Sequence, residues 1–234
     1  MAKYKIADLV FEANTVYEYS HKLCEDYKYE GDLPTQFCLT TTKEDILAEQ
    51  ARTTEPCPDP YAECLALFRK LCDRALEVSD TIVFHSSAVA VDGEAYLFTA
   101  PSGTGKSTHT KLWRELFKDK AVMINDDKPM IRLIDGEFYV YGTPWNGKHR
   151  IGENTKAKIK AICKIGRAKE NHIEKCSTTE MLLTVLNQTT RPTDMAQMDK
   201  LLSLIDKLLS NVPLYKLGCN MDIEAAKIAY EGMQ

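Results

Sequence analysis

Two kinds of hydrophobic pattern alternate along the second half of this chain. Short apolar runs joined by an Asp-Gly pair predict antiparallel hairpins, because Asp-Gly favours the tight two-residue turn between paired strands. The two predicted hairpins are 82–100, with its turn at Asp92-Gly93, and 130–141, with its turn at Asp135-Gly136. They indicate a sheet that contains antiparallel pairs.

Helical spacing of apolar residues predicts five helices. They are expected over 61–76, 108–117, 178–188, 194–209 and 223–230. The third of these follows a capping box formed by Ser177 and Glu180. Further strands are expected over 4–11, 36–41, 121–125 and 212–217. Because the last third contains three of the helices, it is expected to be mainly helical.

These elements predict an α/β (α+β) fold. A mixed, partly antiparallel sheet with hairpins around a glycine-rich turn is packed with helices, and a small β-rich region precedes it. The expected organisation is a small β-rich region over 1–55, a linker and helix over 56–80, and a larger domain over 81–234. Three prolines within Pro56 to Pro60 mark the linker, because proline excludes regular structure there.

Composition narrows the functional classes. The chain has 234 residues, 44% of them hydrophobic and 27% charged, which favours a globular protein over a disordered one. The net charge of −4 gives no general attraction for nucleic acid or an anionic membrane. Eight scattered cysteines without a C-x-x-C pair favour a reduced, cytoplasmic protein. No signal-peptide core and no run of roughly 18 apolar residues are found, so no membrane partner is expected.

The segment 100–107, here called the phosphate loop, fits the pattern G-x-x-x-x-G-K-[ST] except that alanine replaces the first glycine. Glycines at 103 and 105 let backbone N–H groups converge on phosphate oxygens, Lys106 reaches the β- and γ-phosphates, and Ser107 is a magnesium ligand. The expected nucleotide-binding residues are Ser102, Gly103, Thr104, Gly105, Lys106, Ser107 and Thr108. The alternative is a glycine-rich strand-to-helix turn with a surface lysine. A predicted strand before the loop and a helix after it favour phosphate binding, so the region 81–234 is expected to be a nucleotide-binding domain.

Asp126 and Asp127 follow the buried-strand pattern 121–125. Carboxylates after such a strand can hold Mg²⁺ or accept a proton from an attacking hydroxyl, whereas the alternative is a solvated turn. His85, within an apolar run, is typical of a core histidine on its own. His109, at the start of the helix after the phosphate loop, is expected to cap the helix or face solvent.

Together His85, the turn at 92–93, the phosphate loop and the Asp126-Asp127 pair resemble the kinase domain of HPr kinase/phosphorylase over about 84–131. That family shares its fold class with phosphoenolpyruvate carboxykinase, and its phosphate loop follows a hairpin in a mixed sheet. The resemblance implies catalytic roles for His85 and Lys106, with Asp126 on the metal and Asp127 as the base.

The chain also departs from that family. The segment 138–142 lacks the family's later glutamate-and-arginine signature, which argues against HPr as acceptor and against phosphorylase activity. The small N-terminal sheet and the Gly142-Thr143-Pro144 segment look more like the shorter HPr-kinase-like proteins, some of which are associated with modification of ribosomal peptides. The chain is far shorter than the carboxykinases.

The expected function is an ATP- and Mg²⁺-dependent kinase that transfers a phosphoryl group to a hydroxyl of a peptide, protein or small molecule. An ATP-binding regulatory module and a simple NTPase are the alternatives, and a homo-oligomer is left open. The segment 145–150 contains Lys148 and Arg150, which are expected to bind an anionic acceptor with Trp145 and Gly147 beside them. Its alternative is an ordinary solvated loop.

Overall fold

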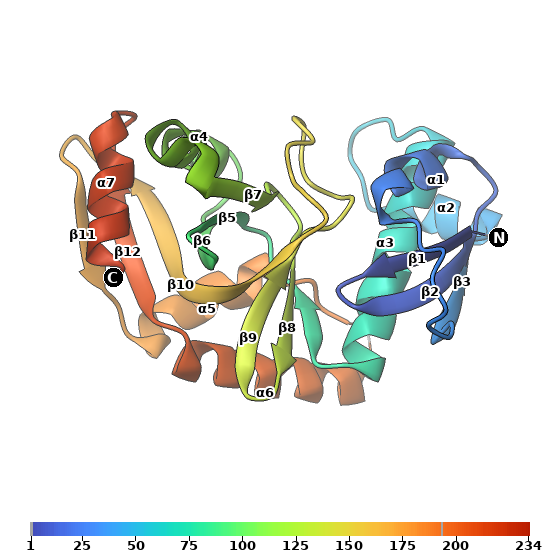
Figure 1. Cartoon of the computed structure of the whole chain (residues 1–234). Coiled ribbons are helices and arrows are strands. Elements are labelled where there is room, and N and C mark those ends of the chain that lie inside the picture. The colour runs from blue at the N-terminus through green and yellow to red at the C-terminus, as the bar shows by residue number, and fades with distance from the viewer. Residues whose placement is uncertain (1, 193) are drawn as a thin grey trace. The chain divides into compact units, whose positions relative to one another are not determined.

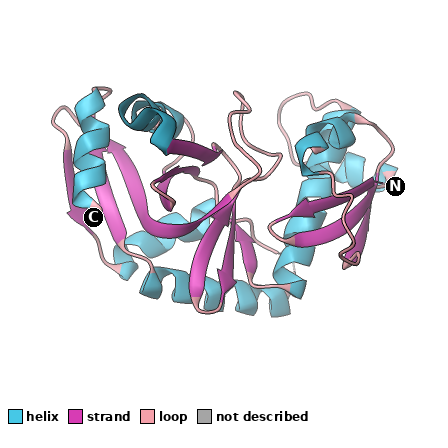
Figure 2. Ribbon diagram, viewed as in Figure 1, coloured by secondary structure: helices cyan, strands magenta, loops and turns pink. Residues whose placement is uncertain are grey.

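A computed structural model of the chain describes residues 2–192 and 194–234 (Figure 1). The chain divides into two compact units, Met1–Ser79 and Asp80–Gln234. The first unit contains a three-stranded sheet and the second contains a larger mixed sheet with helices (Figure 2). The predicted mixed α/β class and the small N-terminal sheet are therefore confirmed.

The sheet of the first unit has the order β1-β2-β3. Strands β1 (Ala2–Ile6) and β2 (Leu9–Asn14) are antiparallel, and β3 (Phe37–Thr40) runs parallel to β2. Residues 7–8 join β1 and β2 with φ angles of 51° and 59°, as a tight hairpin turn requires. The single extended run expected over 4–11 is thus wrong, because this turn interrupts it.

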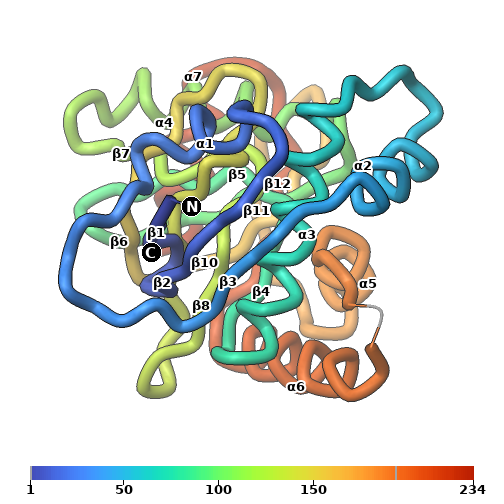
Figure 3. The backbone as a smooth tube through the Cα atoms, turned by 90° about the vertical axis from the view of Figure 1, so that its right-hand side faces the viewer, coloured from blue at the N-terminus to red at the C-terminus, as the bar shows by residue number. Residues whose placement is uncertain are grey.

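Helices complete the first unit: α1 (Tyr19–Leu23), the 3₁₀ turn η1 (Glu25–Tyr27), α2 (Lys43–Gln50) and α3 (Asp59–Val78). Helix α2 was not predicted, although Thr42 and Asp45 form a reciprocal capping box at its start. It packs against α3 (Figure 3). Helix α3 extends the predicted 61–76 at both ends.

Buried Glu63 of α3 ties the segments of the first unit together. Its carboxylate accepts hydrogen bonds from the backbone N–H groups of Val16 and Tyr17 and from the hydroxyl of Thr41. A buried carboxylate with several donors is satisfied rather than reactive. Glu63 is therefore a structural group.

Nine strands form the sheet of the second unit among the described residues. In chain order they are β4 (Thr81–Val83), β5 (Ser87–Val91), β6 (Glu94–Thr99), β7 (Ala121–Asn125), β8 (Met130–Ile134), β9 (Glu137–Tyr141), β10 (Lys156–Arg167), β11 (His172–Lys175) and β12 (Leu214–Cys219). Both Asp-Gly hairpins are confirmed, since β5 pairs with β6 and β8 with β9 in antiparallel register.

The long strand β10 joins the parts of this sheet. Its first residues pair with β9 in antiparallel register, and its later residues run parallel to β6 and to β12. Neither β10 nor β11 was predicted, so the prediction that the last third is mainly helical is wrong. The alternation of lysine with apolar residues over 156–161 is the pattern that marks β10 in the sequence.

Helices cover both faces of the sheet (Figure 1). Helices α4 (Lys106–Phe117) and α7 (Ile223–Gly232) lie on one face, and α5 (Thr178–Gln188) and α6 (Met195–Asn211) lie on the other. A short 3₁₀ turn, η2 (Lys118–Lys120), follows α4. Because helices cover both faces, every residue of β5 is buried.

An aromatic cluster fixes α4 and α7 on the sheet. Its rings share one core and lie within 6 Å of a neighbouring ring; they are Tyr96, Phe98, Trp113, Phe117 and Tyr230. His109 joins this cluster, since its ring meets Phe98 edge to face and its Nε2 accepts a hydrogen bond of 3.0 Å from Trp113 Nε1. The expectation that His109 caps the helix or faces solvent is wrong, because the ring is 2% exposed.

Burial lowers the pKa of His109 from its usual 6.5 to about 4. The unfolded chain binds this proton below pH 6.5, whereas the folded protein does so only near pH 4, so the stabilisation is complete above pH 6.5 and is lost as the pH falls through this window. We expect the free energy of unfolding to fall by about 2 kcal/mol from this group between pH 7.5 and pH 5, measured by urea denaturation. In His109→Gln, whose amide oxygen can still accept from Trp113, this part of the pH dependence should disappear. An unchanged pH dependence in the variant would contradict the assignment.

Candidate functional site

The phosphate loop connects β6 to the N-terminus of α4, as the sequence predicts. Helix α4 begins at Lys106, two residues earlier than expected. Its N-cap residue is Gly105, and no side chain caps the helix N-terminus. The first N–H groups of α4 are therefore available to a ligand, and the helix dipole favours an anion there.

Two glycines give the phosphate loop its path. Gly103 has a φ of 77° and Gly105 a φ of 127°, which side chains with a Cβ rarely adopt. Space is not the reason for glycine, because a Cβ at either position would meet nothing within 4 Å. Backbone conformation alone therefore requires these two glycines.

Lys106 is held inside the phosphate loop. Its side chain is buried, and Nζ donates a hydrogen bond of 2.9 Å to the carbonyl oxygen of Ala100. Burial lowers the pKa of Lys106, while the charges of Asp127 and Asp126 partly oppose this. An anionic ligand would add counter-charge next to the buried ammonium.

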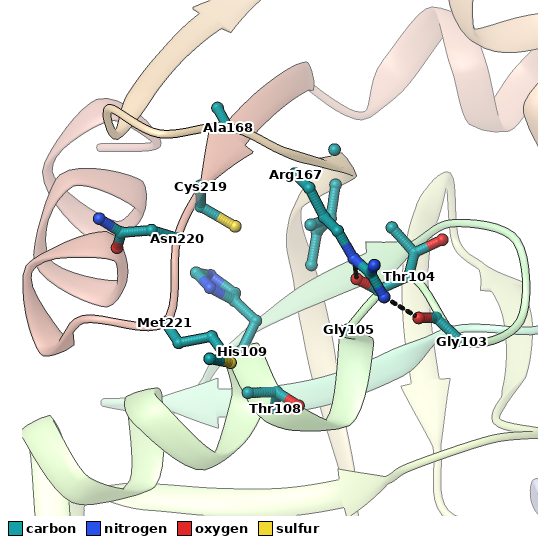
Figure 4. A pocket seen from close by; sticks show the side chains of 12 residues that line it. Gly103, Thr104, Gly105, Thr108, His109, Arg167, Ala168, Cys219, Asn220 and Met221 are labelled. Atoms are coloured by element: carbon teal, nitrogen blue, oxygen red, sulfur yellow. Dashed lines mark hydrogen bonds between the residues drawn. The ribbon is translucent and has the colours of Figure 1, made fainter.

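Arg167, at the end of β10, braces the phosphate loop from a distant part of the sequence (Figure 4). Its guanidinium donates hydrogen bonds to the carbonyl oxygens of Gly103 at 2.6 Å and Thr104 at 3.2 Å. These bonds hold the two peptide planes. Sequence reasoning missed Arg167, because only the pairing of β10 with β6 places it beside the phosphate loop.

Asn125 fixes the turn that carries the two aspartates. Its side-chain oxygen accepts from the backbone N–H groups of Asp127 at 2.8 Å and Lys128 at 2.7 Å. Its amide group donates to the carbonyl and hydroxyl oxygens of Thr143, both at 3.1 Å. Asn125 and Thr143 are fully buried positioning residues to which sequence reasoning assigned no role, although a side chain bonding forward to the backbone is typical of asparagine in turns.

Asp126 is tied to the sheet and, through it, to α4. Buried Ser87 of β5 donates its hydroxyl to Asp126 Oδ1. Ser87 Oγ also lies 2.9 Å from Thr110 Oγ1 on α4. One carboxylate oxygen of Asp126 is thus used to orient the side chain, which is 6% exposed as a residue.

His85 and Asp127 form a pair. The distance from His85 Nε2 to Asp127 Oδ1 is 3.0 Å, and the side chains are 25% and 34% exposed. His85 lies in a break between β4 and β5. Its backbone N–H donates to the carbonyl oxygen of Gln188, and the backbone N–H of Ser86 donates to the carbonyl oxygen of Asp127. The single strand expected over 82–91 is therefore wrong, and the break explains why His85 is not a core residue.

The surroundings of Asp127 favour its ionised form. Burial acts to raise the pKa of this carboxyl, but the hydrogen bond from His85 and the charges of Lys128 and Lys106 outweigh burial and lower the pKa below its usual value. Asp127 is consequently a carboxylate at neutral pH, able to accept a hydrogen bond or a proton.

The loop after β9 passes directly over the aspartates. Gly147, with a φ of 78°, lies so close that a Cβ there would be 3.5 Å from Asp126 O and Asp127 Cβ. Trp145 is 9% exposed, and its carbonyl accepts from Lys128 N–H, so it is part of the loop's packing rather than a free stacking surface. Lys148 follows Gly147 beside the aspartates.

One cavity of about 370 Å³ brings most of the predicted residues together. It is lined by His85, Ser102, Gly103, Gly105, Lys106, Ser107, Thr108, Asp126, Asp127, Gly147, Lys148 and His149. We call it the site cavity. Thr104 lines a neighbouring cavity instead, and Arg150 is absent from the described lining of both. His149 was not singled out from the sequence.

A divalent cation fits these groups in part. Among the described residues, no three His, Cys, Asp or Glu side chains are grouped as a self-sufficient metal site. Magnesium commonly takes only one or two carboxylates and completes its shell with phosphate oxygens and water. The Ser107 hydroxyl and the Asp126 carboxylate, which line the same cavity, match that donor set.

In the described part of the chain, no helix is both long and apolar enough to cross a membrane.

Comparisons with known proteins give a distant match. No family model matches the chain, and no curated protein matches it. Among solved structures, the Hpr(Ser) kinase/phosphatase from Coxiella burnetii is similar over 64% of this chain and 94% of that chain, with 8% identity and a TM-score of 0.39. Both values are low, and no property of that protein is carried over to this chain.

Replacing Asn125 with alanine should loosen the aspartate turn. The variant removes the acceptor of the Asp127 N–H and the donor to the buried Thr143 oxygens, while the Lys128 N–H keeps its bond to the Trp145 carbonyl. We expect a loss of about 2–4 kcal/mol in the free energy of unfolding, measured by urea denaturation. Asn211→Ala, which removes an exposed asparagine, is the matched control and should cost less than about 0.5 kcal/mol. An equal decrease in the free energy of unfolding in the two variants would contradict the positioning role of Asn125.

Proposed function

We propose that this protein is a Mg²⁺-dependent kinase that transfers the γ-phosphoryl group of ATP to a hydroxyl acceptor. The observation that carries the proposal is the site cavity, because Lys106 and Ser107 of the phosphate loop share it with the His85–Asp127 pair. A phosphate-binding loop alone would fit any nucleotide-binding protein. A carboxylate in the same cavity, held in place by a histidine, adds the proton acceptor that phosphoryl transfer to a hydroxyl uses.

The phosphate loop would hold the donor. Backbone N–H groups at the uncapped start of α4 bind phosphate oxygens, and the Lys106 ammonium exchanges the Ala100 carbonyl for the β- and γ-phosphates. Ser107 and Asp126 would hold Mg²⁺, which, when bound, neutralises charge on the phosphates. Ser87 keeps the Asp126 carboxylate in orientation.

Asp127 would act on the acceptor. The acceptor oxygen forms a bond to the γ-phosphorus, the bond between that phosphorus and the β–γ bridging oxygen breaks, ADP leaves, and the hydroxyl proton passes to the Asp127 carboxylate. This carboxyl is ionised at neutral pH, because its pKa lies below its usual value, so it has a lone pair to offer the proton. His85 holds it in place through the 3.0 Å contact.

Two other functions use the same cavity differently. A regulatory ATP-binding module would need no proton acceptor, and a simple NTPase would use water in place of the hydroxyl. The His85–Asp127 pair favours catalysis over the module. Measuring ADP release with and without candidate peptide, protein and small-molecule acceptors separates all three. Release that rises with an acceptor and yields a phosphorylated product supports the kinase. ATP binding without release would reject catalysis.

The two aspartates should differ when each is replaced by asparagine. Asp127→Asn should keep nucleotide affinity and lower the rate of transfer by about two to four orders of magnitude, the usual contribution of a general base. Asp126→Asn should weaken Mg²⁺-nucleotide binding as well, because its carboxylate is the proposed metal ligand. Calorimetry with Mg²⁺·ATP and single-turnover kinetics make the comparison. The reverse pattern would exchange the two roles.

Lys148 is the proposed contact for an anionic acceptor, with Arg150 expected from the sequence to share this role. Lys148 lines the site cavity and Arg150 does not. Reversing each charge separately should therefore have unequal effects on kcat/KM for the acceptor. Lys148→Glu should lower kcat/KM for the acceptor at least tenfold, about 1.4 kcal/mol, with little change in ATP affinity. Arg150→Glu, two residues away, is the matched control and should change it less than about threefold. Equal effects would place both residues in acceptor binding.

A further inference from the structure

A second cavity, of about 510 Å³, also borders the phosphate loop (Figure 4). Gly103, Gly105 and Thr108 line both this cavity and the site cavity. The remaining walls come from Thr104 of the phosphate loop, from His109 on α4, and from residues 165–168 and 219–221 at and just after the ends of β10 and β12. We propose that the second cavity holds the base and ribose of a nucleoside triphosphate, which makes the donor a nucleotide rather than a bare polyphosphate. This proposal rests on the proposed function.

The direction of the phosphate chain supports this assignment. In loops of this pattern the lysine meets the β- and γ-phosphates, while backbone N–H groups of the loop cradle the α- and β-phosphates. Lys106 lines only the site cavity, together with the aspartates. Thr108, two residues further on, lines both cavities. A triphosphate with its γ-end beside Asp127 therefore points its other end towards the second cavity.

The lining of the second cavity suits an uncharged, flat group. Apart from Arg167 and the ring of His109, its side chains are small, apolar or uncharged; they are Thr104, Thr108, Ile165, Ala168, Cys219, Asn220 and Met221. Met221 is 77% exposed at the rim, and a thioether packs well on aromatic rings. Arg167 can stack its planar guanidinium on a base while it braces the phosphate loop.

His109 adds a polar group to the wall. Because Trp113 can only donate, His109 Nε2 must be the acceptor, so the neutral ring carries its proton on Nδ1. Nδ1 is buried and has no hydrogen-bond partner among the described residues. A buried donor without an acceptor is costly. A nitrogen or oxygen of a base or ribose seated against this wall could satisfy it.

The experiment compares two ligands that share the phosphate chain. Calorimetry with Mg²⁺·ATP and with Mg²⁺·tripolyphosphate should show that the wild-type protein binds ATP at least tenfold more tightly. Met221→Ala should raise the Kd for ATP by about three- to tenfold, since it removes one apolar contact with the base, and leave that for tripolyphosphate unchanged. Met195→Ala, which removes a methionine of equal exposure on α6, should alter neither.

Photolabelling with 8-azido-ATP locates the base directly. We expect labelled peptides from 165–168 or 219–221, and excess ATP should prevent the labelling. Labelling elsewhere would overturn the proposal. Equal affinity for ATP and tripolyphosphate would also overturn the proposal. If that binding still required Lys106, the phosphate site of the proposed function would nevertheless remain supported. If the protein binds neither ATP nor tripolyphosphate, both the proposed function and the assignment of the second cavity to the base and ribose are wrong.

Discussion

The positive φ angles of Gly103 and Gly105 are the constraint on which the candidate site depends. They let the chain turn from β6 into α4 so that the helix starts without a side-chain cap and Lys106 folds back on the Ala100 carbonyl. A residue with a Cβ at either position would be strained whatever the space around it. Arg167 then fixes the two carbonyl groups between these glycines.

Antiparallel pairing brings the aspartates to this turn. Strand β5 lies between β6, which leads into the phosphate loop, and β7, which ends before Asp126. Ser87 of β5 therefore reaches Asp126 on one side and Thr110 of α4 on the other. Asn125 completes the arrangement, because its hydrogen bonds join the aspartate turn to Thr143 and give both aspartates a rigid support.

The sequence predicted elements whose signals are local. Asp-Gly turns and capping residues revealed the hairpins and α5, and the glycine-lysine spacing located the phosphate loop. It could not place His109, because burial of that ring depends on Phe98 and Trp113 together. Arg167 was missed for a similar reason, since only sheet pairing brings β10 to β6. Helix α2 and strand β10 had local signals, a capping box and an alternating pattern, that were overlooked.

Calorimetry with Mg²⁺·ATP, on the wild-type protein and on Lys106→Ala, shows whether the loop at 100–107 binds phosphate. Lys106 is buried, and its ammonium is held by a carbonyl that a phosphate can replace. We expect clear binding to the wild-type protein and at least a tenfold loss of affinity in the variant, while circular dichroism shows both to be folded. Absence of binding to the wild-type protein, or equal binding to a folded variant, would contradict a phosphate site at this loop.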